Sequence, residues 1–209
     1  MTMQAPPRVR TWNRIDGLPH VQRLALSAVF VALGVVLSTA IAIPVGPAII
    51  SPTQHLINVL VGVLLGPWYA VLTALAISVI RNGLGTGSIL AFPGSVFGAF
   101  LVGWVYYKVR RSDLAAFAEP IGTALIGGVV AYLLVAGVDA PTKLLGFITV
   151  RPMSPAPYLE VFTGAFALIA IFAVSSIPGS ALGFVVLKAL RRANLAPSED
   201  APPEPKPET

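Results

Sequence analysis

The chain has 209 residues, of which 56% are hydrophobic and only 11% are charged, whereas a soluble domain typically carries about 25% charged residues. This composition excludes an ordinary water-soluble protein, and the lack of cysteine excludes disulfides, thiolate metal sites and thiol nucleophiles. The basic residues behind the net charge of +5 lie where membrane topology needs them, so the charge does not indicate nucleic-acid binding.

Six transmembrane helices are predicted in chain order, which makes the expected fold an all-α integral membrane protein. Between Leu24 and Ile80 there is no Lys, Arg, Asp or Glu, so this stretch must hold two or three membrane segments in series. Proline and glycine mark the connections, including a loop at residues 44–51, the turn Gly66-Pro67 and a long connection at residues 138–157. The expected helices cover residues 21–43, 52–65, 68–81, 89–108, 120–137 and 158–190.

The last expected helix is longer than a membrane requires. Its 33 residues would extend roughly 50 Å, against roughly 30 Å of hydrocarbon. Pro178 removes a backbone donor within it. We therefore expect one long helix that kinks at Pro178 and crosses the membrane once.

The distribution of Lys and Arg predicts the orientation. Six crossings with the N-terminus in the cytoplasm place eleven basic residues inside and leave Arg81, Lys143 and Arg151 outside. Five crossings would put the main basic clusters on opposite sides. We therefore expect both chain ends in the cytoplasm of a multi-pass cell-membrane protein. Its expected parts are a cytoplasmic arm at residues 1–20, a six-helix membrane domain at residues 21–192 and a disordered cytoplasmic tail at residues 193–209.

Small residues recur at four-residue spacing, which permits close contact between membrane helices. The patterns are Ala28-x-x-x-Ala32, Gly34-x-x-x-Ser38, Ala70-x-x-x-Ala74 and the string Pro-Gly-Ser-x-x-Gly, which occurs at residues 93–98 and 178–183. Packing within one bundle would explain all of them. The alternative is docking of a partner membrane protein, for which Ala28 and Ala32 on the first helix are the best candidates.

The densest polar group at membrane depth lies at the outer end of the second helix. Gln54 and Asn58 share a helix face, and His55 lies about 100° round from them. A capping box from Ser51 to Gln54 would account for those two residues. It does not account for His55 and Asn58, for which ligand contact and interhelical hydrogen bonding both stay open.

A second polar group follows the third helix. Arg81 suits the negative end of the helix dipole and could extend outward to water. Asn82, Thr86 and Ser88 lie in a glycine-rich loop on the same side as His55. This juxtaposition predicts a solvent-facing binding pocket. The glycines lack the Gly-Lys-Ser/Thr of a nucleotide-binding loop.

Three residues at helix starts complete the polar inventory. Glu119 precedes Pro120 on the expected cytoplasmic side, where a carboxylate stabilising a helix N-terminus is the preferred interpretation. Tyr158 and Glu160 open the last helix on the outer side. For Glu160, a dipole role and a ligand role both stay open.

No sequence motif indicates catalysis or an internal energy source. Gly-x-Ser-x-Gly, His-Glu-x-x-His, paired acids and the Walker A sequence are absent, and the histidines are His20 and His55. We therefore predict that the chain is not an enzyme and carries no catalytic residue, metal or cofactor. A transport function would need energy from a partner.

Several strings together resemble the ThiW family, whose members are substrate-binding S components of energy-coupling factor (ECF) transporters. The resemblance is dense over residues 21–130. The strings are PTQHLIN at 52–58, GPWYA at 66–70, RNGLGTG at 81–87, AFPGS at 91–95 and EPIGT at 119–123.

The resemblance implies a six-helix bundle that binds a vitamin or vitamin precursor in an outward-facing pocket. It further implies a transmembrane coupling protein and two ATPase subunits as partners, with Ala28 and Ala32 contacting the coupling protein. The implied ligand is hydroxyethylthiazole, the thiazole moiety of thiamine, and residues 138–157 could form a lid over the pocket.

The polar residues are compatible with a neutral heteroaromatic alcohol. His55, Asn58 and Asn82 would serve its ring nitrogen and hydroxyl, and Phe92 or Tyr158 would pack on the ring. Gln54, Arg81, Thr86, Ser88 and Glu160 complete the predicted site. Glu160 alone could supply a carboxylate to a cation such as thiamine.

Three alternatives remain at this point. The chain could be an S component for thiamine or another vitamin. It could be a small membrane enzyme acting on a lipid, with His55 and Glu160 as acid and base. It could also be a structural or channel-forming bundle, which would not require polar groups clustered on one side.

Overall fold

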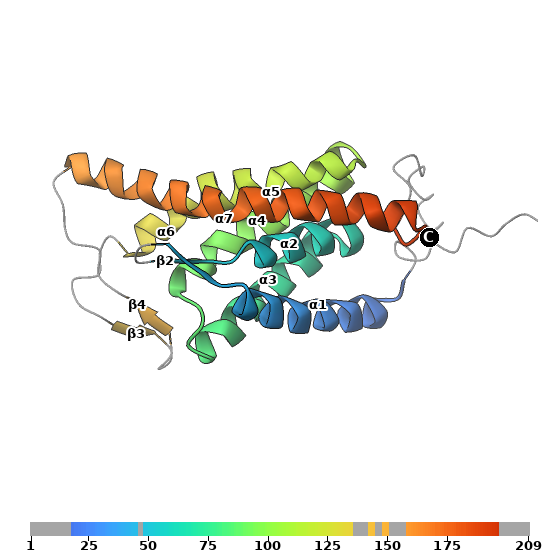
Figure 1. The fold of residues 1–209 in the computed structure, drawn as a ribbon, viewed down its shortest axis with the longest axis horizontal. Helices are drawn as coiled ribbons and strands as arrows, with labels where there is room; N and C mark the ends of the chain where they lie inside the picture. Colours follow the sequence, from blue (N-terminus) through green and yellow to red (C-terminus); the bar gives the residue numbers. More distant parts are fainter. Residues whose placement is uncertain (1–17, 46–47, 136–141, 145–147, 151–157, 197–209) are drawn as a thin grey trace, which may run out of the picture.

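The computed structural model describes residues 18–45, 48–135, 142–144, 148–150 and 158–196. The described chain is predominantly helical, and its successive segments run back and forth along the long axis of the molecule (Figure 1). The segments at its two ends are α1 (His20–Ala40) and α7 (Tyr158–Arg192). The N-terminus of α1 and the C-terminus of α7 lie at the same end of the bundle, which we call the basic end because Lys188, Arg191 and Arg192 are there.

The second helix, α2 (Pro52–Leu65), is the centre of the bundle. Every residue in it except Leu56 is buried, and it packs against α1, α3 (Pro67–Gly83), α4 (Pro93–Trp104) and α7. Pro52 occupies the first turn, where its missing N–H costs nothing, and Gly66 ends the helix with a positive φ of 99°. The bounds predicted for this helix are confirmed.

Two further segments are helical throughout but change their winding. The fourth combines the 3₁₀ turn η1 (Ile89–Ala91), α4 (Pro93–Trp104) and the π-helix η2 (Val105–Val109). The fifth combines the 3₁₀ helix η3 (Asp113–Phe117), α5 (Ala118–Pro120), the π-helix η4 (Ile121–Gly127) and α6 (Gly128–Val135).

The fifth segment begins at Asp113, seven residues before the predicted start at Pro120. Proline normally starts a helix because it lacks an N–H and its ring collides with the carbonyl four residues earlier. Here Pro120 lies where the winding changes from 3₁₀ to π, and this change accommodates it inside the segment. Glu119 is consequently carried into the bundle.

The connections contain two short antiparallel hairpins that the all-helical prediction omitted. Strand β1 (Ile43–Val45) pairs with β2 (Ala48–Ile50), so α1 ends at Ala40, three residues before its predicted end. Strand β3 (Thr142–Leu144) pairs with β4 (Ile148–Val150), within the connection predicted at residues 138–157. Isoleucine and valine favour extended backbone, which explains strands in place of irregular loops.

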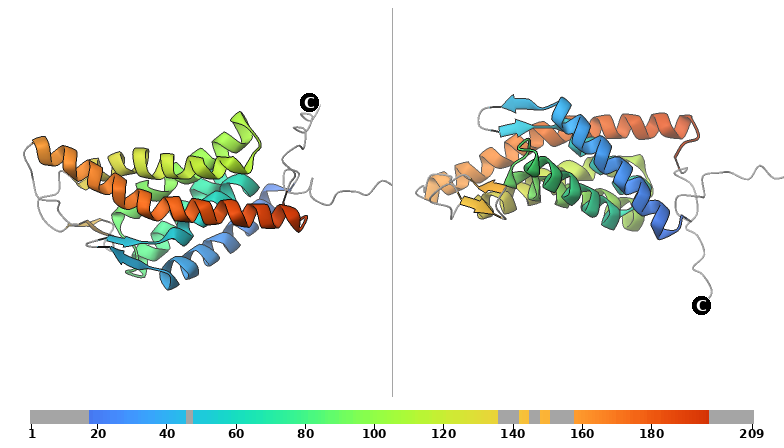
Figure 2. Two further views of the ribbon diagram at one scale, coloured as in Figure 1. Left: turned by 45° about the horizontal axis from the view of Figure 1, so that its top comes forward. Right: turned by 90° about the horizontal axis from the view of Figure 1, so that it is seen from below.

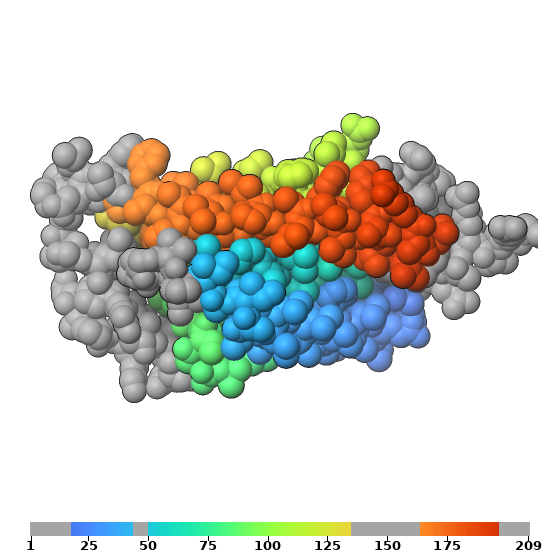
Figure 3. Space-filling view, viewed as in Figure 1, coloured from blue at the N-terminus to red at the C-terminus, as the bar shows by residue number. Residues whose placement is uncertain are grey.

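The seventh helix is continuous from Tyr158 to Arg192, as the prediction of one long helix required. Its 35 residues include Pro178 in the interior. It runs the length of the bundle and forms much of one face of the molecule, with α1 exposed along the same face (Figure 3). A view turned by 45° shows α1 along the lower edge of the bundle, and the view from below shows it in front of the other helices (Figure 2).

Four described helical stretches are long and apolar enough to cross a membrane. They are His20–Ala40, Ile89–Val109, Asp113–Leu134 and Gly164–Arg192. With 14 residues, α2 is about 21 Å long and α3, with 17, about 26 Å, both short of roughly 30 Å of hydrocarbon. The structure therefore supports a multi-pass membrane protein, while six crossings are not confirmed. The predicted arm at residues 1–20 and tail at residues 193–209 lie almost entirely outside the described residues.

Candidate functional site

The polar N-terminus of α2 lies deep in the bundle. It meets α7 at Gly179, where an added Cβ would lie 2.2 Å from the carbonyl oxygen of Pro52 and 2.7 Å from Cβ of His55. Gly179 follows Tyr158 by 21 residues, or about 31 Å of helix, and precedes Arg192 by about 20 Å. The first turn of α2 is therefore far from the N-terminus of α7 along the length of the bundle.

Glu119 is the centre of a buried hydrogen-bond network, which we call the Glu119 cluster. The carboxylate is 0% exposed. Its Oε1 lies 2.7 Å from His55 Nδ1 and accepts hydrogen bonds from Asn58 Nδ2 at 3.1 Å and the Thr123 hydroxyl at 2.7 Å. Its Oε2 accepts from the Ser180 hydroxyl at 3.2 Å. The carboxylate thus joins α2, the fifth segment and α7.

The two Pro-Gly-Ser-x-x-Gly strings surround the Glu119 cluster. At Gly98 an added Cβ would lie 2.2 Å from Thr123 Oγ1 and 2.6 Å from Glu119 Oε1, so only glycine leaves room for the carboxylate. Gly179 allows α7 to cross α2 beside His55, and the following Ser180 donates to Glu119. Packing within the bundle therefore accounts for these strings, as the structural interpretation of the sequence predicted.

His55 and Asn58 both make interhelical hydrogen bonds through one side-chain nitrogen. Asn58 Nδ2 also donates to the carbonyl oxygen of Ser95 at 3.3 Å, while Asn58 Oδ1 is buried with no hydrogen-bond partner in the described part of the chain. His55 uses Nδ1 and leaves Nε2 unbonded there. Each residue therefore keeps one free acceptor or donor position.

Arg81 points inward, which corrects the expectation that it extends outward to water. Its side chain is 4% exposed and donates to Gln54 Oε1 and, at 3.0 Å, to the carbonyl oxygen of Thr86. The Nε atom of Arg81 is buried without a partner among the described residues. Gln54 is thereby engaged with Arg81, and the predicted capping box does not form because Ser51 donates instead to the Ser38 carbonyl.

The predicted residues after Arg81 form a compact turn. Asn82 is buried and donates from Nδ2 to the carbonyl oxygens of Ser78, at 2.8 Å, and Ser88, at 3.1 Å. Thr86 bonds back to the Arg81 carbonyl through its N–H at 2.9 Å. This turn places the Thr86 carbonyl oxygen against the guanidinium group of Arg81.

The other three predicted site residues are Phe92, Tyr158 and Glu160. Phe92 is half-buried at the start of α4. Tyr158 and Glu160 begin α7, about 31 Å of helix from its contact with α2, and their side chains lie outside the described residues.

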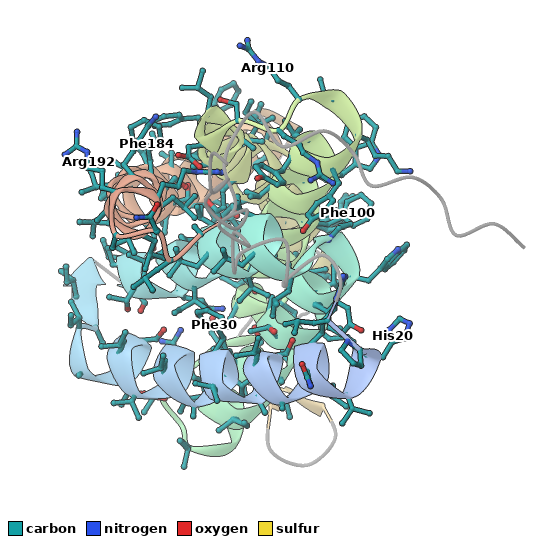
Figure 4. The ribbon with its side chains drawn as sticks, turned by 90° about the vertical axis from the view of Figure 1, so that its right-hand side faces the viewer. His20, Phe30, Phe100, Arg110, Phe184 and Arg192 are labelled. Atoms are coloured by element: carbon teal, nitrogen blue, oxygen red, sulfur yellow. The ribbon has the colours of Figure 1, made fainter. Side chains whose placement is uncertain are left out.

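A second ionic network closes the basic end. Asp113 is 0% exposed and accepts from Arg191 Nε at 2.7 Å and 2.9 Å, with Lys188 Nζ at 3.9 Å. Arg191 also donates to the hydroxyl of Tyr106 at 3.2 Å. Arg110 and Arg192 project from this end, as the view onto it shows (Figure 4).

The helix α1 has two different small-residue faces. Ser27, Gly34 and Ser38 are buried, and an added Cβ at Gly34 would lie 2.3 Å from Ile77. Ala28 and Ala32 are exposed on the other face. The inner face packs within the bundle, and the outer face is exposed in the described structure.

Sequence reasoning missed Glu119, Thr123 and Ser180 as members of the polar site. The available signal was a carboxylate in an otherwise apolar segment, with a threonine one helical turn later. The described residues contain no group of three or more His, Asp or Glu side chains suited to a metal ion.

A comparison of the sequence with models of protein families shows which family the chain belongs to. The model of the thiamine-precursor transporter protein (ThiW) matches residues 24–156, more than half of the chain. The chain belongs to the ThiW family. Membership confirms the resemblance seen in the sequence and makes the chain a transmembrane transporter component that serves vitamin uptake as an S component, consistent with the prediction that it is not an enzyme. Among curated proteins, none matches this ThiW chain.

Proposed function

We propose that this ThiW protein is the substrate-binding subunit of an ECF importer in the cell membrane. It captures hydroxyethylthiazole from outside and delivers it through a transmembrane coupling protein and two ATPase subunits. The observation that carries the proposal is the buried polar network at the start of α2, within a chain that the ThiW model matches.

The charges in this network favour a neutral ligand. Glu119 is fully buried and already contacts four polar groups, so a cationic ligand would have to compete with these groups for the carboxylate. The other buried ion away from the basic end of the described structure is Arg81, which would repel a cation. A neutral thiazole alcohol fits this electrostatic environment better than the thiazolium ring of thiamine.

The proposed subunit crosses the membrane six times with both ends in the cytoplasm. Support comes from the common position of the two described chain ends at the basic end, because an even number of crossings brings both ends to one side. The short α2 can stop inside the bundle because protein surrounds it and shields its polar first turn from lipid.

The coupling protein is proposed to dock on the exposed face of α1. Ala28 and Ala32 lie there among exposed apolar side chains such as Val29 and Val36. Small residues let two helices approach closely, which suits contact between membrane proteins.

Ligand-dependent unfolding of the full chain in detergent tests the proposed substrate. Hydroxyethylthiazole should raise the Tm progressively, by the equivalent of about 2.7 kcal/mol at one hundred times its Kd. A rise with thiamine alone would replace the ligand and keep the transport class. No rise with either compound would overturn the proposed substrate.

Two substitutions locate the site in the same assay. His55→Ala and Asn58→Ala should weaken hydroxyethylthiazole binding at least tenfold while the protein still unfolds cooperatively. Lys108→Ala, at the basic end, is the control and should bind as the unaltered protein does. Unchanged affinity in both site variants would remove these residues from the ligand site.

A further inference from the structure

His55 is held at one ring nitrogen and left free at the other. Nδ1 lies 2.7 Å from Glu119, and Nε2 has no hydrogen-bond partner among the described residues. The side chain retains 9% of its surface, and Nε2 is not among the fully buried polar atoms that lack a partner. Nε2 is therefore the edge of the ring that another molecule can reach.

The partners of Glu119 decide which nitrogen carries the proton. Oε1 already accepts hydrogen bonds from Asn58 and Thr123, and Oε2 accepts from Ser180, as an ionised carboxylate does. The short contact with His55 is then a hydrogen bond donated by Nδ1–H. Because the bond made by one ring nitrogen sets the tautomer, the other nitrogen of a neutral ring must be an acceptor.

The balance of buried charge favours a neutral ring. Away from the basic end, the buried ions of the described structure are Glu119 and Arg81, one negative and one positive. A neutral His55 leaves this interior with no net charge, whereas an imidazolium would add an uncompensated positive charge at membrane depth.

We propose that Glu119 is a positioning residue that locks His55 in the Nδ1–H tautomer, so that Nε2 accepts a hydrogen bond from the hydroxyl of the ligand. This inference rests on the proposed function and specifies how the site recognises its substrate. It predicts selection for a ligand that donates a hydrogen bond, because an analogue without the hydroxyl leaves Nε2 unpaired.

The tautomer can be measured without any ligand. The chain has only two histidines, so the full protein labelled with ¹⁵N-histidine gives two sets of ring signals, and His20→Gln identifies those of His55. The expected spectrum shows a protonated Nδ1 and an unprotonated Nε2. A protonated Nε2, in either the other tautomer or the imidazolium, would overturn the proposal.

The effect on recognition is tested with a matched pair of ligands and variants. Unaltered protein should bind hydroxyethylthiazole at least tenfold more tightly than 5-ethyl-4-methylthiazole, which lacks the hydroxyl. Glu119→Gln should move the His55 signals towards the Nε2–H form and abolish this preference while leaving binding of the ethyl compound nearly unchanged. Thr73→Val removes a buried hydroxyl on α3 that has no hydrogen-bond partner among the described residues, and it should keep both the tautomer and the preference.

The outcomes separate this inference from the proposed function. A preference for the hydroxyl that survives in a Glu119→Gln protein with altered histidine signals would refute the role of His55 Nε2. The expected tautomer without binding of either thiazole would uphold the positioning by Glu119 and overturn the proposed ligand. If Glu119→Gln does not fold, the unaltered protein still tests the proposal. Its histidine spectrum reports the tautomer of His55, and its preference between the two thiazoles reports recognition of the hydroxyl.

Discussion

Two carboxylates lie six residues apart in the fifth helical segment and are both completely buried, yet their surroundings differ. Asp113, at the basic end, meets Arg191 and Lys188. Glu119, farther from that end, meets His55 and three neutral donors. The same chemical group is thus compensated by cations at one depth and by hydrogen bonds at the other.

Distance from water explains this difference. Arg191 ends α7, where its side chain retains 12% of its surface and can stay near the aqueous boundary while it binds Asp113. A cation beside Glu119 would have to be carried into the bundle, at a desolvation cost that neutral donors avoid. The Asp113 network therefore fastens two helix ends, and the Glu119 cluster orients polar groups in the interior.

Removing each carboxylate in turn should have unequal effects, and this is the largest difference that we predict. Glu119→Ala leaves four hydrogen-bond donors in the interior without their acceptor, and it should lower the free energy of unfolding by about 3–5 kcal/mol. Asp113→Ala leaves Arg191 able to reach water and should cost about 1–3 kcal/mol. Thermal unfolding in detergent measures both, and equal losses would contradict the distinction between the two sites.

The space around Glu119 gives a smaller and more specific effect. Gly98→Ala would press a Cβ against Thr123 and the carboxylate, and should cost about 1–3 kcal/mol while weakening ligand binding. Gly83→Ala is the matched control, because an added Cβ there meets nothing within 4 Å. Its stability should stay within about 0.5 kcal/mol of the unaltered protein. If both variants unfold alike, close packing around Glu119 is not what requires glycine at position 98.

Local signals in the sequence were sufficient for much of the fold. The helix α2 begins at Pro52 and ends just before Gly66, as predicted. A first-turn proline and a glycine at a helix end act through backbone geometry alone, so the sequence was enough to place both limits. The four-residue spacing of Gly34 and Ser38 predicted a small-residue packing face on α1, and both residues are buried there. The hairpins were missed because short extended segments beside prolines carry no periodicity that distinguishes them from loops.

The candidate site was predictable only in part. His55 and Asn58 stood out because polar residues are costly in an apolar helix. Glu119 was misjudged because a carboxylate before a proline also fits a helix start, and only the change in winding around Pro120 places it inside. Its contact with Ser180, 61 residues away, depends on tertiary packing that local patterns do not encode.

The smallest effect on stability is expected on the outer face of α1, remote from both carboxylates. Ala28→Leu adds apolar bulk at an exposed position, so it should leave unfolding and thiazole binding unchanged while reducing ATP-dependent uptake by cells that express the complete transporter. Ala40→Leu makes the same change at another exposed position of α1, about 120° round the helix, and should leave uptake intact. Equal uptake by both variants would exclude Ala28 from the partner interface. Equal loss would mean that bulk anywhere along α1 disturbs transport, and the small-residue face would then have no special role.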